Sequence, residues 1–282
     1  METSLTEQKA GEHRAVVVVP IYTLTLSEME QRTLRRALRV LSRHDVVVVK
    51  PQSLDVSSLG SLLGVDQRWT VESFADSYFA GREGYNRLMM SEEFYERFLA
   101  LDYMLVVQTD VLVFSDQLDE WRSRGYDYVG APWLPAVQTV KGFHPLHRAV
   151  WHVRKALSHV TPGFHAVSLK YSVGNGGFSL RRVAKFHAIA STHRDAIAEI
   201  IASERGVGGF EDVFWSVKAR QLDDTFTVAP WLEALLFSVE SHPDLAMHYT
   251  GGELPFGSHA FARRRNSREW RHWIDIDSLL EG

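Results

Sequence analysis

One acidic residue stands where a strand ends. Asp110 follows the apolar run Tyr103-Met-Leu-Val-Val-Gln108, which predicts a buried strand. In open parallel sheets ligands bind beyond the carboxyl ends of the strands, so Asp110 is in a position to hold a hard divalent ion. The alternative is a solvated turn residue before a strand over 111–114, because Asp is also favoured in turns.

Two further acids, Glu211 and Asp212, directly follow Gly208-Gly-Phe210. This sequence predicts the start of a helix, where the helix dipole keeps a carboxylate ionised near neutral pH. An ionised carboxylate can act as a general base that takes a proton from an attacking hydroxyl group. The alternative role for Asp212 is simple capping of the helix, because Asp is a favoured N-cap residue.

A glycine-rich segment lies between these acids in the sequence. Val173-Gly-Asn-Gly-Gly-Phe-Ser-Leu180 contains three glycines, which would weaken any regular helix or strand. Glycine is useful where the backbone approaches another group closely. The segment therefore predicts a loop that approaches a ligand.

The elements that would position these residues follow an α/β pattern. The continuous valine runs Ala15–Pro20 and Asp45–Lys50 predict strands that are buried on both faces, as in a parallel sheet. Between them, Ser27-Glu-Met-Glu30 has the spacing of a capping box, and leucines from Leu34 to Leu41 form the apolar stripe of a helix. The predicted fold is a mixed, largely parallel sheet with helices on both faces. Two more helices are expected over 91–101 and 195–205.

The composition excludes several classes of protein. The chain has 282 residues, a formal net charge of -4 and no cysteine, so a disulfide framework, a cysteine nucleophile and a general attraction to nucleic acid are excluded. No Gly-x-Gly-x-x-Gly or Walker sequence follows the first strand, which disfavours Rossmann dehydrogenases and P-loop kinases. The apolar runs are far shorter than the ~18–20 residues of a membrane-spanning helix. Residues 1–14 lack the apolar centre of a secretory signal, so we expect a disordered tail and a cytoplasmic protein.

Two segments are rich in basic residues. Residues 134–172 contain five histidines, five lysines or arginines and no acid, which predicts an insertion with a basic face. The C-terminal tail 263–282 begins with three arginines. Both segments are interpreted as solvated basic faces, with contact to an acceptor or to an anionic membrane surface as the alternative.

Taken together, the motifs resemble nucleotide-sugar glycosyltransferases of the type A (GT-A) fold. They are more similar still to an uncharacterised family of glycosyltransferase-like proteins with that fold. The resemblance covers roughly residues 14 to 262. It rests on Val19-Pro-Ile-Tyr22, Gly84-Tyr-Asn-Arg-Leu-Met89, Gln108-Thr-Asp110, Tyr126-Asp-Tyr-Val-Gly-Ala-Pro-Trp133, Gly174-Asn-Gly-Gly-Phe-Ser-Leu-Arg181, Glu211-Asp212 and Pro255-Phe-Gly-Ser-His-Ala260.

The resemblance implies a single domain over 15–262 with a metal site. Its nucleotide-binding half is 15–110 and its acceptor half is 111–262. Asp110 matches the second aspartate of an Asp-x-Asp motif, which holds Mn²⁺ or Mg²⁺ against the donor diphosphate. Gln108 replaces the first aspartate, so Gln108 and Thr109 would contact only ribose or water. His259 is the implied second metal ligand, and its alternative is a structural histidine.

The resemblance also implies transfer of a sugar from a nucleotide sugar, UDP-linked, to a hydroxyl group of a glycan, a lipid-linked acceptor or a small molecule. The Gly-Gly-x-Glu-Asp pattern is similar to that of inverting galactosyltransferases, which favours Asp212 as the base and Glu211 as a contact to donor or acceptor sugar. The alternative is an inactive GT-A-like module that binds a sugar or nucleotide. The donor contacts expected are Pro20, Tyr22, Lys50, Arg82, Asn86, Gln108, Thr109, Trp133, Asn175, Gly176 and Gly177.

Overall fold

The computed structural model describes residues 14–64, 69–135, 169–203 and 210–281. Its main sheet has six strands in the order β3-β2-β1-β4-β7-β6. Strands β3, β2, β1 and β4 are parallel, and β7 pairs antiparallel with both β4 and β6. The prediction of a mixed, largely parallel sheet is confirmed. The strands are β1 (Ala15–Pro20), β2 (Asp45–Pro51), β3 (Thr70–Phe74), β4 (Tyr103–Val107), β6 (Tyr128–Val129) and β7 (Phe178–Arg182).

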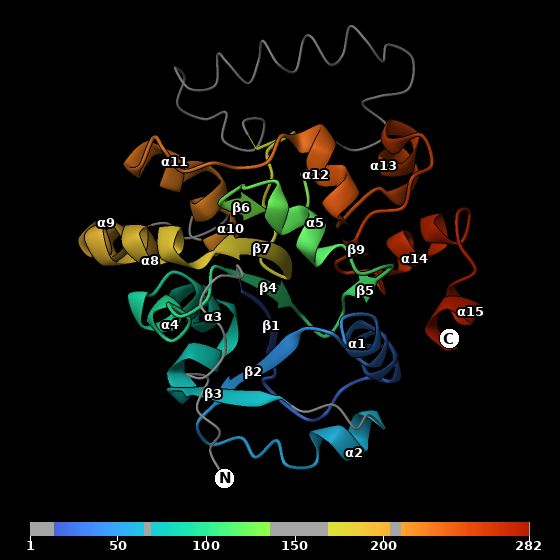
Figure 1. The fold of residues 1–282 in the computed structure, drawn as a ribbon, viewed down its shortest axis with the longest axis horizontal. Helices are drawn as coiled ribbons and strands as arrows, with labels where there is room; N and C mark the ends of the chain where they lie inside the picture. Colours follow the sequence, from blue (N-terminus) through green and yellow to red (C-terminus); the bar gives the residue numbers. More distant parts are fainter. Residues whose placement is uncertain (1–13, 65–68, 136–168, 204–209, 282) are drawn as a thin grey trace, which may run out of the picture.

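Helices cover both faces of this sheet, as predicted (Figure 1). Side chains alternate along a strand, so Val17 and Val19 of β1 join one apolar cluster while Val16 and Val18 join another. The first cluster is covered by α1 (Glu28–Val40), α2 (Leu59–Leu63) and α5 (Leu118–Ser123). The second is covered by α3 (Gly81–Met89), α4 (Glu92–Glu96), α8 (Val183–Thr192) and α9 (Arg194–Ser203).

Helix α1 begins at the capping box that the sequence predicts. The backbone N–H of Ser27 donates to Oε2 of Glu30 at 2.9 Å, and the backbone N–H of Glu30 donates to Oγ of Ser27 at 3.3 Å. Two of the free donors at the helix N-terminus are thereby satisfied. The leucine stripe from Leu34 to Leu41 is buried against the sheet.

One predicted helix is longer than the helix observed, and the end of another cannot be compared. The helix expected over 91–101 ends early, because α4 stops at Glu96 and the next residues form turns. In these turns the N–H groups of Phe98 and Leu101 bond to carbonyls three residues back, which winds the chain tightly into β4. The helix expected over 195–205 is α9, and its expected end at Gly206 lies outside the described residues.

A second, smaller sheet brings together residues from distant parts of the chain. Its strand order is β5-β9-β8, with β5 at Leu112–Val113, β8 at Ser238–Val239 and β9 at Gly257–Ser258. The strand expected over 111–114 is observed as β5. Asp110 lies just before β5, and Glu240 and His259 directly follow β8 and β9. Since Leu112, Val239 and Ser258 are paired in register, these three titratable residues meet at one end of the sheet.

The C-terminal segment, expected as a tail over 263–282, is folded over its described residues 263–281. Helices α14 (Arg264–Trp270) and α15 (Ile276–Glu281) bury Trp270, Ile276 and Leu280 in a third apolar cluster. This cluster also contains residues of α12 (Trp231–Phe237) and α13 (Pro243–Thr250). The many exposed arginines made the segment look like a solvated tail in the sequence. Its few buried apolar residues are widely spaced and form no recognisable pattern.

Other expectations fall on parts of the chain that are not described. Residues 1–13 and 136–168, which hold most of the expected N-terminal tail and basic insertion, lie outside the described residues. In the ranges that the structure describes, no helix combines the length and the apolar character needed to cross a membrane.

Arg36 of α1 fastens the C-terminal helices to the rest of the domain. Its guanidinium donates to the carbonyl of Val113 at 2.7 Å, of Phe114 at 2.8 Å and of Leu279 at 2.8 Å. One side chain therefore links α1, the end of β5 and α15. Charge-assisted hydrogen bonds of this kind are stronger than neutral ones.

We predict that Arg36→Ala lowers the free energy of unfolding by about 2–4 kcal/mol, because three partly buried carbonyls lose a charged donor and only some regain water. Urea unfolding of the variant and of the wild type measures the difference. The control is Arg39→Ala on the same helix, where the side chain is exposed. Equal stabilities of the two variants would contradict this role for Arg36.

Candidate functional site

Asp110, His259 and Glu240 form a chain of charged groups at the end of the small sheet. Nε2 of His259 lies 3.3 Å from Oδ1 of Asp110, and Nδ1 lies 3.6 Å from Oε1 of Glu240. Burial lowers the pKa of His259, but the two carboxylates outweigh burial and raise the pKa to about 9. Burial raises the pKa of Asp110, yet the hydrogen bond and charge of His259 bring that pKa below its ordinary value. At neutral pH the histidine is therefore a cation between two carboxylates.

The turn that carries Asp110 is anchored to helix α1. Oγ1 of Thr109 donates to Oε1 of Glu30 at 2.9 Å, and Oγ1 of Thr33 donates to the carbonyl of Thr109 at 2.6 Å. Glu30 therefore has two roles: Oε2 caps helix α1, and Oε1 holds Thr109. Thr109, expected to contact the donor, instead directs its hydroxyl group at α1 and holds the backbone beside Asp110.

The glycine loop, residues 174–177, is packed against side chains of the protein itself. A Cβ atom at Gly174 would lie 2.2 Å from Cη2 of Trp133, and one at Gly177 would lie 2.3 Å from Nε2 of His259. At Gly176 it would lie 1.8 Å from Oε1 of Glu211. The expectation that these glycines make room for a ligand is therefore revised, because protein side chains occupy the space.

Asn175 connects this loop to the charged chain. Its Oδ1 accepts from the backbone N–H of Gly177 at 2.7 Å and of Phe178 at 3.1 Å, so Nδ2 is left to face Nδ1 of His259 at 2.9 Å. The backbone N–H of Asn175 donates to Oη of Tyr128 at 3.0 Å. The amide orientation is thereby fixed. Nδ2 can donate to Nδ1 only when Nδ1 carries no proton, so this hydrogen bond belongs to the neutral form of His259.

Glu211 and Asp212 begin α10 (Glu211–Val213), which continues through η4 (Phe214–Lys218) into α11 (Ala219–Leu222). The N-cap is Phe210, and Oδ1 of Asp212 accepts only the neighbouring N–H of Val213 at 2.9 Å among the hydrogen bonds of the described chain. Burial and the charge of Glu211 raise the pKa of Asp212 to about 7. The expectation that the helix end keeps this acid ionised is therefore corrected, because burial outweighs the helix terminus.

Tyr22, Gln108 and Pro20 lie at the carboxyl ends of β1 and β4. Nε2 of Gln108 donates to Oη of Tyr22 at 3.4 Å, and the ring of Tyr22, 42% exposed, packs on Tyr85 at 5.5 Å. Tyr22 therefore presents an aromatic face near Asp110. Pro20, an expected donor contact, is buried in β1 opposite Val49 and is part of the packed sheet.

Arg82, Asn86 and Lys50, the other expected donor contacts, lie on α3 and β2. The guanidinium of Arg82 stands 5.2 Å from the ring centroid of Phe210, and Oδ1 of Asn86 accepts from the backbone N–H of Glu211 at 3.4 Å. Both contact the start of α10. Lys50 lies in β2, one strand further from β4 than β1 is, and its Nζ donates to a neighbouring backbone carbonyl at 3.2 Å.

The Asp110 and His259 pair has the geometry of two adjacent metal ligands. Their facing atoms are 3.3 Å apart, close to the ~3 Å between neighbouring ligands that each lie ~2.1 Å from an octahedral ion. A carboxylate with an imidazole suits Mn²⁺ and similar ions. Within the described ranges no group of three His, Asp or Glu residues fits one ion, so the remaining ligands would have to be phosphate oxygens and water.

Glu240, Arg181 and Tyr128 also belong to the site, although the sequence did not predict a role for them. Glu240 carries the same signal as Asp110, a carboxylate that directly follows a strand, but β8 is too short to be recognised. Arg181 and Tyr128 stand within two of the motifs that carry the resemblance. Their burial, at 0% exposure each, has no signature in a single sequence.

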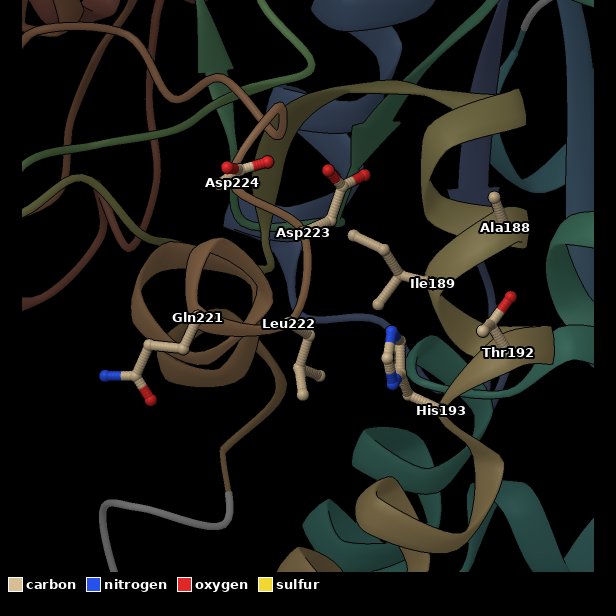
Figure 2. Close-up of a pocket in the computed structure, with 8 residues that line it drawn as sticks. All are labelled: Ala188, Ile189, Thr192, His193, Gln221, Leu222, Asp223 and Asp224. Atoms are coloured by element: carbon tan, nitrogen blue, oxygen red, sulfur yellow. The ribbon is translucent and has the colours of Figure 1, made fainter.

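A separate hollow of about 480 Å³ lies between α8 and α11 (Figure 2). Its wall includes His193, Thr192, Asp223 and Asp224. The carboxylate of Asp223 is already engaged with Thr225 and with Nζ of Lys185 at 3.3 Å. None of the site residues expected from the sequence lines this hollow.

We predict that Asp110→Asn lowers the pKa of His259 from about 9 toward the ordinary 6.5, because one of its two carboxylates is lost. An NMR titration of the ring signals, assigned with His259→Gln, measures the shift. Asp55→Asn, at an exposed carboxylate, is the control and should leave the titration unchanged. An unchanged His259 titration in Asp110→Asn would disprove the pairing.

Solved glycosyltransferase structures resemble this fold. Mouse xyloside xylosyltransferase 1 in its apo form is 11% identical with a TM-score of 0.52, over 87% of this chain and 97% of that one. The galactosyltransferase LgtC, in complex with donor and acceptor sugar analogs, is 13% identical with a TM-score of 0.52, over 94% and 95%. The glycosyltransferase GlyE of Streptococcus pneumoniae TIGR4 has a TM-score of 0.47 and 13% identity over 95% of this chain, which spans 62% of the length of GlyE.

The likeness to the xylosyltransferase and to LgtC establishes the type A fold for this chain. A comparison with curated proteins found no match. The model of one protein family, described as "Protein of unknown function (DUF5672)", matches residues 68–259. Because this match spans more than half of the chain, the protein belongs to the DUF5672 family.

Proposed function

We propose that the protein is a glycosyltransferase that moves a sugar from a UDP-linked donor to a hydroxyl group of an acceptor. The observation that carries the proposal is the meeting of Asp110 and His259, 3.3 Å apart, beyond the carboxyl end of β4 in a type A sheet. A structure of similar fold, LgtC, holds donor and acceptor sugar analogs. The acceptor class, whether glycan, lipid-linked or small molecule, is left open by these residues.

Asp110 and His259 would hold Mn²⁺ or Mg²⁺ at the donor diphosphate, and the ion would neutralise the charge of the leaving UDP. Since His259 carries a proton below about pH 9, metal binding has to release that proton. With the ion on Nε2, the ring proton of His259 would stand on Nδ1 and point to Oε1 of Glu240, 3.6 Å away, which would keep the ring in place. Trp133 would offer an apolar face to a sugar ring.

Asp212 is proposed as the general base of the reaction. The acceptor oxygen would form a bond to the anomeric carbon while the bond from that carbon to the UDP oxygen breaks, and the acceptor proton would pass to the Asp212 carboxylate. Attack from the face opposite the leaving group inverts the anomeric carbon. A carboxylate with a pKa of about 7 is well matched to this task, because it binds a proton more strongly than an ordinary aspartate and is still half ionised at neutral pH.

A second candidate function is a sugar- or nucleotide-binding module without catalysis. It is favoured by Gln108, which stands where the wider fold has a carboxylate, and by the salt bridge that already joins Asp110 to His259. Both functions require donor binding. Only the transferase requires Asp212 to exchange a proton.

Our prediction for donor binding is that UDP raises the melting temperature more with Mn²⁺ than with a chelator, and more at pH 8.5 than at pH 6.5. Ligand at 100 times its Kd stabilises the folded state by about 2.7 kcal/mol, a shift of several degrees. In Asp110→Asn, the part of the UDP-induced rise in melting temperature that depends on Mn²⁺ should be lost. In Asp55→Asn it should be retained. Equal UDP affinity with Mn²⁺ and with chelator would sink the metal proposal.

For catalysis, Asp212→Asn should reduce kcat by ~10²–10⁴ with donor affinity nearly unchanged, because only proton transfer is lost. In the wild type, kcat/KM should rise with pH through about 7, because the base must be ionised, and the variant should lose this limb. Asp224→Asn, at an exposed carboxylate of the same helical region, is the matched control.

The anomeric configuration of the product, read by NMR, tests the base assignment independently. Inversion is expected. Retention of configuration, or a wild-type rate for Asp212→Asn, would show that Asp212 is not the base. Donor binding without transfer across a broad acceptor panel would instead support the binding module.

A further inference from the structure

Behind the glycine loop lies an ion pair that is almost completely removed from water. The side chain of Arg181, on β7, has 0% exposure and that of Glu211 has 4%, and Nη2 of Arg181 lies 3.1 Å from Oε1 of Glu211. The guanidinium also donates from Nη1 to Oη of Tyr95 at 2.9 Å and from Nε to Oγ of Ser179 at 3.0 Å. Burying two charges is costly, and an apolar pair of the same volume is often as stable. A contribution to the stability of the fold is therefore not enough to explain why this ion pair is present.

The pair fixes the position of Glu211 from several sides. Oε1 of Glu211 bonds to Arg181 and packs directly on Gly176, where any Cβ atom would clash at 1.8 Å. The backbone N–H of Glu211 donates to Oδ1 of Asn86 on α3 at 3.4 Å. Since β7, α3 and the glycine loop all hold Glu211, the backbone of the next residue, Asp212, is fixed with it.

The pair also sets the charges around Asp212. The charged groups that act on Asp212 are Glu211 from its own helix, Glu240 from the end of β8 and Arg181 from β7, with Glu211 the strongest and Arg181 the weakest. Oε2 of Glu211 is buried and has no hydrogen-bond partner in the described part of the chain. Burial raises the pKa of Glu211, and the charge and hydrogen bond of Arg181 counteract that rise. Arg181 therefore favours the ionised form of Glu211, and the charge of that form acts on Asp212.

We propose that the Arg181 and Glu211 ion pair is a positioning unit for Asp212, which fixes the first turn of α10 at the site and holds a second carboxylate next to Asp212 in the chain. This inference rests on the proposed function, in which Asp212 accepts the proton of the acceptor hydroxyl. Arg181 and Glu211 act through Asp212 and need not touch the substrate. Glu211, expected as a contact to sugar, is thereby assigned a positioning role.

The test replaces both charges at once, with Arg181→Met and Glu211→Gln in one protein. This change keeps the side-chain volumes and the fit against Gly176 and leaves no unpaired buried charge, so the variant should fold. Carboxyl ¹³C NMR should show the pKa of Asp212 falling below about 7, because the repulsion lost with Glu211 exceeds the attraction lost with Arg181. Burial, the largest cause of the raised pKa, is unchanged and should keep the value above the ordinary 3.8. The acid limb of kcat/KM should move to lower pH, and kcat should fall roughly tenfold or more with donor Kd unchanged.

A matched control exists on the same strand. Arg182, the next residue of β7, pairs with the buried Asp127 at 2.8 Å. The double change Arg182→Met with Asp127→Asn removes an ion pair of the same chemistry, and it should leave the Asp212 titration and the pH profile unchanged.

Several outcomes would overturn the proposal. A folded Arg181→Met/Glu211→Gln protein with the wild-type Asp212 titration and the wild-type kcat would do so, as would a wild-type Asp212 that titrates near 3.8. If the double variant does not fold, Glu211→Gln alone is titrated, and an unchanged pKa of Asp212 there would equally count against it. Absence of transferase activity in the wild type would contradict the proposed function, while the NMR titration would still decide whether the pair controls Asp212.

Discussion

The close packing of side chains against the glycine loop 174–177 is the constraint on which the rest of the candidate site depends. Trp133, Glu211 and His259 each occupy the place where a side chain of the loop would otherwise stand. Asn175, the one residue of the loop with a side chain, uses it to brace the loop and to face His259. These three side chains from separate elements can converge here only because the loop glycines have no side chains, and a Cβ atom at any of the three would displace its neighbour.

The site separates two kinds of carboxylate by their surroundings. Asp110 is paired with a protonated histidine, which lowers its pKa and keeps it ionised at any physiological pH. Asp212 has other carboxylates as its main charged neighbours, and its pKa of about 7 lets it gain or lose a proton under mild conditions. When the surroundings lower the pKa of one acid and raise the pKa of another, the two acids can take different roles at the same pH. Asp110 is suited to carry a permanent negative charge, and Asp212 is suited to exchange a proton.

Sequence patterns predicted the parts of the fold that depend on local physics. The valine runs of β1 and β2 and the capping box at Ser27 are such parts, and the structure has them as expected. Contacts between residues that are far apart in the sequence leave no local sequence pattern that would predict them. The bond of Thr109 to Glu30, the burial of Arg181 and the approach of Glu240 to His259 all arise from tertiary packing. The residue types at the site were therefore predictable, whereas their partners, and with them the direction of each pKa shift, were not.

The pairing of β5 with β9 has a consequence for how the protein is made. Leu112 pairs with Ser258, so the strand that follows Asp110 waits for a partner that comes much later in the sequence. Contacts with such a large sequence separation form slowly, because a long loop must close first. A nascent chain on the ribosome can complete the valine-rich strands early, yet His259 joins Asp110 only after residues 111–259 have been made. Folding intermediates should therefore contain the main sheet while lacking the site, and chaperones would meet the protein in that form.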